Sequence, residues 1–261
     1  MAFRTEPVDV AGCRVHLRRG GAGRPLLYLH GMDGAAEFPP ILEELSRSYD
    51  VWLPQHPGFG HSAEPEWLDT IHDLAYFYLD FLEAMKLEQV HLVASSLGGW
   101  LALEMAVRST ARMRALTVIA PPGIYRAGLL RGDPFLWTAE ERVRNVYLDQ
   151  SIPDAQLAKR ASPEDVEIAQ KNFHTFARLA WEPRLFDPHL HKWLHRIQVP
   201  VQIVWGDSDR LLPPAYAEEF RKLLPHARVD LIERCGHNPH IEKPREFLAR
   251  FAAFTAKLPA N

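Results

Sequence analysis

A serine between two small residues is the first candidate for chemistry in this sequence. Ser96 follows an apolar run and precedes a helical pattern. A nucleophile at a sharp strand-to-helix turn holds strained backbone angles, and the positions two before and two after it must be small. Ala94 and Gly98 meet this requirement, whereas Ser95 has larger residues at the same positions. Ser96 is therefore the predicted nucleophile.

A serine hydroxyl is a weak nucleophile, so it needs a base, an acid that orients the base, and donors for the oxyanion. His237 directly follows the last apolar run, within Gly-His-Asn-Pro, and is the predicted base. His240 could compete, but it lies beyond a proline. The acid is Asp207 or Asp209, since both follow the apolar run 199–205. The order Ser, Asp, His is the one expected for an elbow serine.

Two backbone amides are predicted to stabilise the oxyanion. The amide of Leu97 directly follows the nucleophile. The amide of Met32 lies on the loop after the apolar run 25–29. Each such donor is typically worth about 3–4 kcal/mol of activation free energy.

The elements that position these residues alternate along the chain. A hairpin is expected at 8–10 and 14–17, and Asp69 is the expected N-cap of a helix over 71–85. Further helices are expected at 38–48, 100–107, 214–224 and from 244 onward, and further strands at 25–29, 49–53, 89–94, 115–120, 199–205 and 228–232. Solid apolar strands that alternate with helices predict a parallel sheet covered on both faces. Ligands of such sheets bind beyond the carboxyl ends of the strands, where the candidate residues lie.

The pattern changes between residues 126 and 196, where no strand is expected. Helices are predicted at 138–149, 154–160, 163–180 and 188–196. Thr138 with Glu141, and Ser162 with Asp165, have the spacing of helix-start signals. This segment is predicted to be an inserted helical subdomain.

Composition restricts the class of protein. The chain has 261 residues, 47% of them apolar, and a net charge of −3 without a basic stripe, so nucleic acid is not an expected partner. No apolar run reaches the length of a membrane span, and the N-terminus has no signal-peptide core, so a cytoplasmic protein without a membrane partner is expected. Cys13 and Cys235 suggest neither a disulfide framework nor a metal site.

Taken together, these motifs resemble the α/β-hydrolase fold superfamily, in the branch that has a helical cap after the sixth strand. The resemblance rests on segments spread along the chain: 30–32, 57–62, 95–99, 206–209, and 236–239 with Glu242 and Pro244. It implies a mostly parallel eight-stranded sheet with helices on both faces, a core of 1–125 and 197–261, and a cap of 126–196. It also implies Asp209 as the acid and His30 as a support of the oxyanion loop.

Other residues are weighed for pocket and metal roles. Histidines 189, 191 and 195 are expected on a solvated face, because they share no single helical face and no ligand set is evident. No metal or organic cofactor is predicted. The candidate pocket residues flank the catalytic loops or lie on the expected cap: His30, Phe59, Trp100, Ile124, Trp137, Leu212 and Asn238.

The sequence thus predicts a serine hydrolase that cleaves a small or medium ester-like carbonyl, as a monomer or homodimer. Relatives with an aspartate nucleophile are excluded by Ser96. Hydrolases of carbon–carbon bonds with the same triad are an alternative, although they often carry tryptophan where Asn238 stands. A ligand receptor on the same scaffold and an acyltransferase are two further candidate functions.

Overall fold

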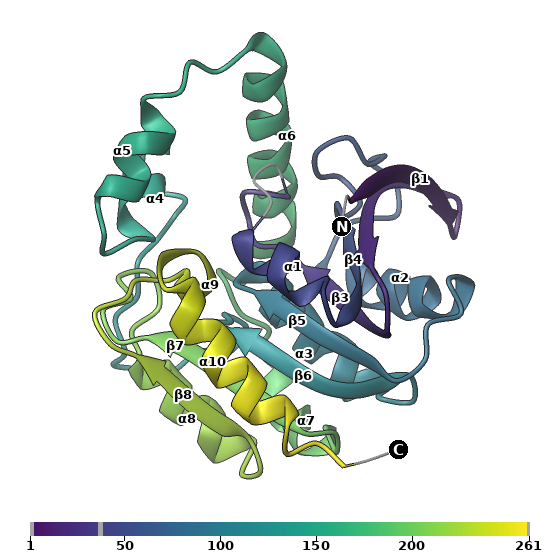
Figure 1. Cartoon of the computed structure of the whole chain (residues 1–261). Helices are drawn as coiled ribbons and strands as arrows, with labels where there is room; N and C mark the ends of the chain where they lie inside the picture. Colours follow the sequence, from purple (N-terminus) through teal and green to yellow (C-terminus); the bar gives the residue numbers. More distant parts are fainter. Residues whose placement is uncertain (1–2, 36–38, 260–261) are drawn as a thin grey trace.

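The chain folds around one eight-stranded sheet in the computed structural model, which describes residues 3–35 and 39–259 (Figure 1). The strand order is β1-β2-β4-β3-β5-β6-β7-β8. The strands are β1 Arg4–Val10, β2 Cys13–Gly21, β3 Arg24–Leu29, β4 Tyr49–Pro54, β5 Val90–Ser95, β6 Met113–Ile119, β7 Val201–Gly206 and β8 Arg228–Ile232. β2 pairs antiparallel with β1 and β4, and the pairs from β4 to β8 are parallel. The predicted mostly parallel sheet is confirmed.

Helices cover both faces of the sheet. One face packs against α2 Ile71–Ala84, α3 Leu97–Arg108 and α8 Ala215–Leu223, and the other against α1 Pro40–Leu45 and α10 Pro244–Thr255. The alternation along β3 shows why, since Leu27 and Leu29 enter the first core and Leu26 and Tyr28 the second. Strands buried on both faces read as continuous apolar runs, which is the pattern in the sequence.

The segment between β6 and β7 is helical, with no strand among its residues. It contains α4 Ala139–Asn145, α5 Ser151–Leu157, α6 Pro163–Ala180, α7 Leu190–Trp193 and the 3₁₀ helix η1 Leu194–Arg196. In Figure 1, α4, α5 and α6 project from one side of the core. Thr138 and Ser162 cap α4 and α6 in capping boxes, as their spacing predicts.

Some predicted boundaries differ from the structure. Thr70, rather than Asp69, is the N-cap of α2, because its hydroxyl accepts the Asp73 amide and the Asp73 carboxylate accepts the Thr70 amide. α1 starts at Pro40, and Phe38, where a helix was expected to begin, lies outside the described residues. Within the described ranges, no helix is both long and apolar enough to cross a bilayer.

Candidate active site

Ser96 sits on a sharp turn between β5 and α3. Its backbone angles are φ 53° and ψ −120°, in a region that costs a non-glycine residue about 1–3 kcal/mol. Its amide donates to the Ile119 carbonyl of β6 at 2.8 Å, which ties the turn to the neighbouring strand. A side chain at Gly98 would come within 2.2 Å of the Leu29 carbonyl oxygen. Gly98 must therefore be small because β3 passes close by.

A chain of hydrogen bonds links Ser96, His237 and Asp209. His237 Nε2 lies 2.9 Å from Ser96 Oγ, and His237 Nδ1 lies 2.7 Å from Asp209 Oδ2. All three side chains are buried, with residue exposures of 8% for Ser96, 2% for His237 and 6% for Asp209. The geometry lets the imidazole accept the serine proton at Nε2 while Nδ1–H donates to the carboxylate.

The two candidate acids have different partners. Asp209 Oδ1 accepts hydrogen bonds from the amides of Leu211 and Leu212 at 2.8 and 2.9 Å, which leaves Oδ2 for His237. Asp207 is exposed and accepts from the Ser208 hydroxyl and the Cys235 amide, so it shapes the turn. The structure brings Asp209, and not Asp207, to the histidine.

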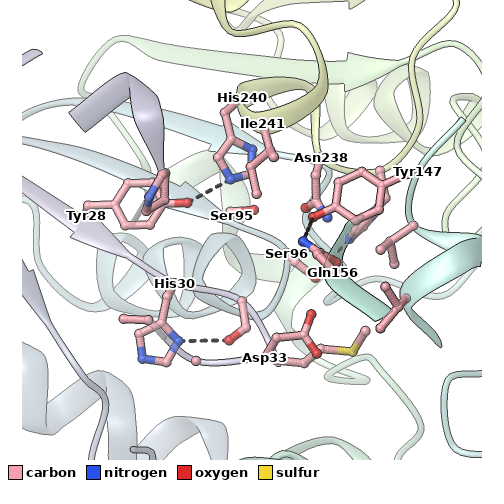
Figure 2. Close-up of a pocket in the computed structure, with 18 of the residues that line it drawn as sticks. Tyr28, His30, Asp33, Ser95, Ser96, Tyr147, Gln156, Asn238, His240 and Ile241 are labelled. Carbon is pink, nitrogen blue, oxygen red and sulfur yellow. Dashed lines mark hydrogen bonds between the residues drawn. The ribbon is translucent and has the colours of Figure 1, made fainter. Parts of the chain in front are cut away.

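The competing histidine also has another partner. His240 Nε2 lies 2.9 Å from the Tyr28 hydroxyl, as Figure 2 shows, and burial lowers the pKa of His240 to about 3. Its ring is therefore neutral near pH 7. Ser95, the last residue of β5, lines the same cavity as Ser96 and His240.

The amides predicted to form the oxyanion hole lie at the ends of β3 and β5. Leu97 is the first residue of α3, where an amide has no partner within the helix. Gly31 precedes Met32, and a Cβ on Gly31 would lie 3.3 Å from the Ser96 Cβ. The loop that carries the Met32 amide thus approaches Ser96 closely.

A cavity of about 290 Å³ opens beside Ser96 (Figure 2). Its floor is built by the ends of β3, β4 and β5, and its wall by the segment 237–241. The loop 30–35 and Pro39 also line it, and the helical segment contributes four residues: Val143, Val146, Tyr147 and Gln156. Among the described residues that line it, none is a lysine or an arginine.

The helical segment is fastened to the loop that carries the base. The His237 amide donates to the Val146 carbonyl at 2.9 Å. Glu242 Oε2 accepts the amides of Leu148 at 2.9 Å and Gly236 at 3.3 Å. The Glu242 carboxylate thus joins the helical segment to the loop that carries His237, the candidate base.

Of the seven candidate pocket residues, His30 and Asn238 line this cavity and the other five lie elsewhere. Trp100 donates through its indole to Glu104 Oε1 at 2.9 Å, and Phe59 packs edge-on against His30 at 5.2 Å between ring centroids. Trp137 lies over Gly132. Ile124 and Leu212 are buried in the core, and the backbone of Leu212 serves Asp209.

Several lining residues had no signal in the sequence. Tyr28 and Leu53 lie within apolar strands and are indistinguishable there from core residues. Tyr147 and Gln156 belong to a helical segment whose packing on the core cannot be deduced from periodicity. Proximity in sequence to a candidate catalytic loop is therefore a poor guide to which residues line the cavity.

A single cluster of three possible metal ligands was found among the described residues. His72, Glu104 and Asp187 offer atoms within 4.8 Å of one another, at the junction of α2 and α3. The Arg108 guanidinium donates to Glu104 Oε2 at 2.7 Å and lies 2.7 Å from His72 Nδ1. A positive charge already occupies this cluster, and histidines 189, 191 and 195 do not belong to it.

Comparison with known proteins places the chain among hydrolases. Residues 26–251 match the model of the alpha/beta hydrolase family. Lipase 1 of Psychrobacter immobilis is 26% identical over 253 residues, which cover 92% of this chain and 79% of the lipase. The 2-hydroxy-6-oxo-2,4-heptadienoate hydrolase of Pseudomonas putida is also 26% identical, over 95% of both chains.

Solved structures agree on the fold. The meta-cleavage product hydrolase of Pseudomonas fluorescens, a mutant complexed with acetates, superposes with a TM-score of 0.81 at 20% identity, covering 97% of this chain and 98% of that one. Lipases and carbon–carbon bond hydrolases are thus similarly distant relatives. The extent of the family match, over most of the chain, shows that this protein belongs to the alpha/beta hydrolase family.

Proposed function

We propose that this protein is a serine hydrolase that cleaves small or medium uncharged ester-like substrates through an acyl-enzyme on Ser96. The observation that carries the proposal is the continuous chain of hydrogen bonds from Asp209 through His237 to Ser96, with distances of 2.7 and 2.9 Å. A protein that only binds a ligand has no need of this arrangement, which argues against a receptor.

The proposed reaction transfers the acyl group first to Ser96 and then to water. Ser96 Oγ attacks the substrate carbonyl as His237 Nε2 takes its proton, and the amides of Met32 and Leu97 stabilise the oxyanion. The imidazolium returns that proton to the leaving alkoxide as the bond to the alcohol breaks. Water then attacks the acyl-enzyme with His237 again as base, releasing the acid and restoring Ser96. Asp209 stays ionised throughout and orients the ring.

The cavity supports the choice of substrate class. Its volume of about 290 Å³ is at the small end of the range for ligand sites. We propose that residues 126–196 act as a cap, because α4 and α5 supply its roof. Two relatives, by their names, act on a heptadienoate and on a hexadienoic acid, and both are carboxylic acids. With no lysine or arginine among the described lining residues, this cavity offers no cation for such a carboxylate, which favours an uncharged ester.

The test is intact mass after exposure to a fluorophosphonate probe, with wild type and Ser96→Ala side by side. We expect one adduct on wild type and none on the variant. Esters of varied acyl and alcohol size, tested next to a vinylogous diketone acid, then define the substrate class. Turnover of the diketone without turnover of esters would favour the carbon–carbon hydrolase. Acyl transfer to an added alcohol in preference to water would favour the acyltransferase.

A further inference from the structure

A buried network of three side chains lies behind the loop that carries Met32. The contacts run from His30, next to this loop, to His56 and then to Tyr78 in the core. His30 is 2% exposed, and His56 and Tyr78 are fully buried. The two imidazole rings stack with their centroids 3.7 Å apart. None of these side chains touches the triad in a hydrogen bond, so the mechanism above leaves His56 and Tyr78 without a role.

The hydrogen bonds determine where each proton lies on His30. The backbone amide of His56 donates to His30 Nε2 at 2.9 Å, so this nitrogen carries no proton. His30 Nδ1 therefore carries it and donates to the Gly31 carbonyl at 2.8 Å, as Figure 2 shows. Burial lowers the pKa of His30 to about 4, which keeps the ring neutral near pH 7.

The same reasoning determines the tautomer of His56. Its Nε2 lies 3.1 Å from the carbonyl oxygen of His30, which can only accept, so Nε2 carries the proton. Burial holds the pKa of His56 well below its usual value, so Nδ1 is unprotonated. Nδ1 accepts the Tyr78 hydroxyl at 2.6 Å. Tyr78 thus selects the tautomer of His56 that binds the His30 carbonyl.

These contacts hold two successive peptide groups of the loop. A peptide unit is planar and trans, so its C=O and N–H point in opposite directions. The Gly31 carbonyl shares its peptide with the Met32 amide, and His30 Nδ1–H holds that carbonyl from behind. The His30 carbonyl shares its peptide with the Gly31 amide, and His56 Nε2–H holds it. Fixing both carbonyls therefore fixes the direction of the Met32 N–H.

We propose that His56 and Tyr78 are positioning residues for the oxyanion hole, acting through the peptides of His30 and Gly31 to aim the Met32 amide at the substrate oxygen. The inference rests on the proposed function of the Met32 amide as an oxyanion donor. It predicts that loss of the Tyr78 hydroxyl, which lies on α2, weakens stabilisation of the oxyanion without altering the triad.

The decisive variant is Tyr78→Phe, which removes one hydroxyl and keeps the buried ring. We expect kcat on an ester to fall about 5- to 30-fold with KM changed less than about 2-fold, a part of the roughly 100- to 1,000-fold lost when an oxyanion donor is removed outright. A trifluoromethyl ketone, whose carbonyl carbon bonds to Ser96 Oγ while its oxygen becomes the oxyanion and His237 takes the serine proton, should bind more weakly by a similar factor. Tyr216→Phe is the matched control, because it also removes the hydroxyl of a buried tyrosine, one that donates to the Leu129 carbonyl.

Two variants of His56 separate positioning from packing. A glutamine side chain can place an N–H near the position of Nε2, whereas leucine cannot donate. We expect His56→Gln to recover kcat and ketone affinity at least about 3-fold over His56→Leu at a similar unfolding midpoint. Thermal unfolding followed by circular dichroism reports whether each variant is folded. If both His56 variants unfold, Tyr78→Phe alone decides the question.

The outcomes distinguish this inference from the proposed function. An active wild type in which Tyr78→Phe behaves like Tyr216→Phe, with lower stability but unchanged kcat and ketone affinity, overturns the positioning role and leaves the hydrolase proposal intact. A wild type without esterase activity or a fluorophosphonate adduct overturns the proposed function and the positioning role together. A selective loss of kcat and ketone affinity in Tyr78→Phe supports both.

Discussion

Two clusters in this protein place a buried carboxylate beside a histidine, and they have different chemistry. In one, Asp209 Oδ2 lies 2.7 Å from His237 Nδ1. In the other, Glu104 Oε2 lies 3.4 Å from His72 Nδ1. The His237 side chain is 2% exposed, whereas that of His72 is 39% exposed. The residue types alone do not explain the difference.

The two clusters differ in the groups that donate hydrogen bonds to each carboxylate. Backbone amides of Leu211 and Leu212 hold Asp209, so its negative charge remains available to the imidazole. Glu104 accepts from the Arg108 guanidinium and the Trp100 indole, and Arg108 also contacts the nitrogen of His72 that faces Glu104. Neutral amides stabilise the Asp209 carboxylate without neutralising it, whereas the Arg108 guanidinium is the nearer ionic partner of Glu104, at 2.7 Å against 3.4 Å for His72. The first arrangement suits catalysis and the second suits a structural tie.

The largest expected effect is a loss of kcat when the cluster of Asp209 and His237 is disrupted. Asp209→Asn should lower kcat about 10,000-fold, because an asparagine at this position favours the wrong tautomer of the histidine. Steady-state hydrolysis of the best ester measures the loss. Glu104→Gln is the matched change in the second cluster and should alter kcat less than about 3-fold. Similar losses of kcat in the two variants would contradict the distinction drawn between the clusters.

The second expected effect is a loss of stability when the cluster of Glu104, Arg108 and His72 is disrupted. Glu104→Gln leaves the partly buried Arg108 guanidinium without its carboxylate, so we expect the free energy of unfolding to fall by about 2–3 kcal/mol. Urea unfolding measures the change. The double variant Glu104→Leu with Arg108→Met removes both charges and should recover most of the loss. A double variant no more stable than Glu104→Gln would refute the ion-pair explanation.

The smallest expected effect concerns His91, a histidine whose hydrogen-bond partner is a hydroxyl group rather than a carboxylate. His91 contacts the Thr117 hydroxyl at 2.9 Å, and burial lowers its pKa to about 3. Its folded-state pKa is below the unfolded value of about 6.5, so the unfolded state binds the proton first. Stability should therefore fall as pH drops below about 6.5, by about 2 kcal/mol from this residue by about pH 5.

The control for this prediction is His91→Gln, which replaces the imidazole with a group that does not titrate. The variant loses some stability at about pH 8 but should lose about 2 kcal/mol less than wild type between about pH 8 and about pH 5. Urea unfolding at the two pH values measures the difference. Equal losses in wild type and variant would show that His91 does not take part in acid destabilisation. His30 and His240, whose pKa values are about 4 and 3, should act in the same direction.

The sequence predicted most of the fold because its signals are local. Strands buried on both faces appear as apolar runs, and the alternation of strand and helix implies parallel pairing, so the sheet could be predicted. The family was predicted from the resemblance of short motifs, such as 57–62 and 95–99. Thr138 and Ser162 predicted helix starts because each bonds to a residue only three positions further along the chain. The N-cap of α2 was displaced by one residue, since Asp69 and Thr70 are both capping types and the hydrogen bonds between Thr70 and Asp73 distinguish them only in the structure.

The candidate site was predictable only in part. Position at a strand end placed Ser96 and His237 at the same edge of the sheet, although 141 residues separate them. The same reasoning left Asp207 and Asp209 open, because side-chain direction after a strand is set by the turn. The structure places Asp209 against the imidazole and leaves Asp207 at the surface.

What the sequence by itself determined is the alpha/beta architecture, its family, and the short list of residues at the carboxyl ends of the strands. The architecture was predicted from hydrophobic periodicity and the alternation of elements, and the family from its resemblance in short motifs, and each of these signals is local in the sequence. Only the tertiary structure decided which residues line the cavity and which groups compensate each charge. Residues of α4 and α5 line the cavity, and Tyr78 contacts His56, which contacts the His30 carbonyl, so each of these contacts joins residues that are distant in sequence. Such contacts depend on the direction in which side chains pack, and no local pattern records that direction.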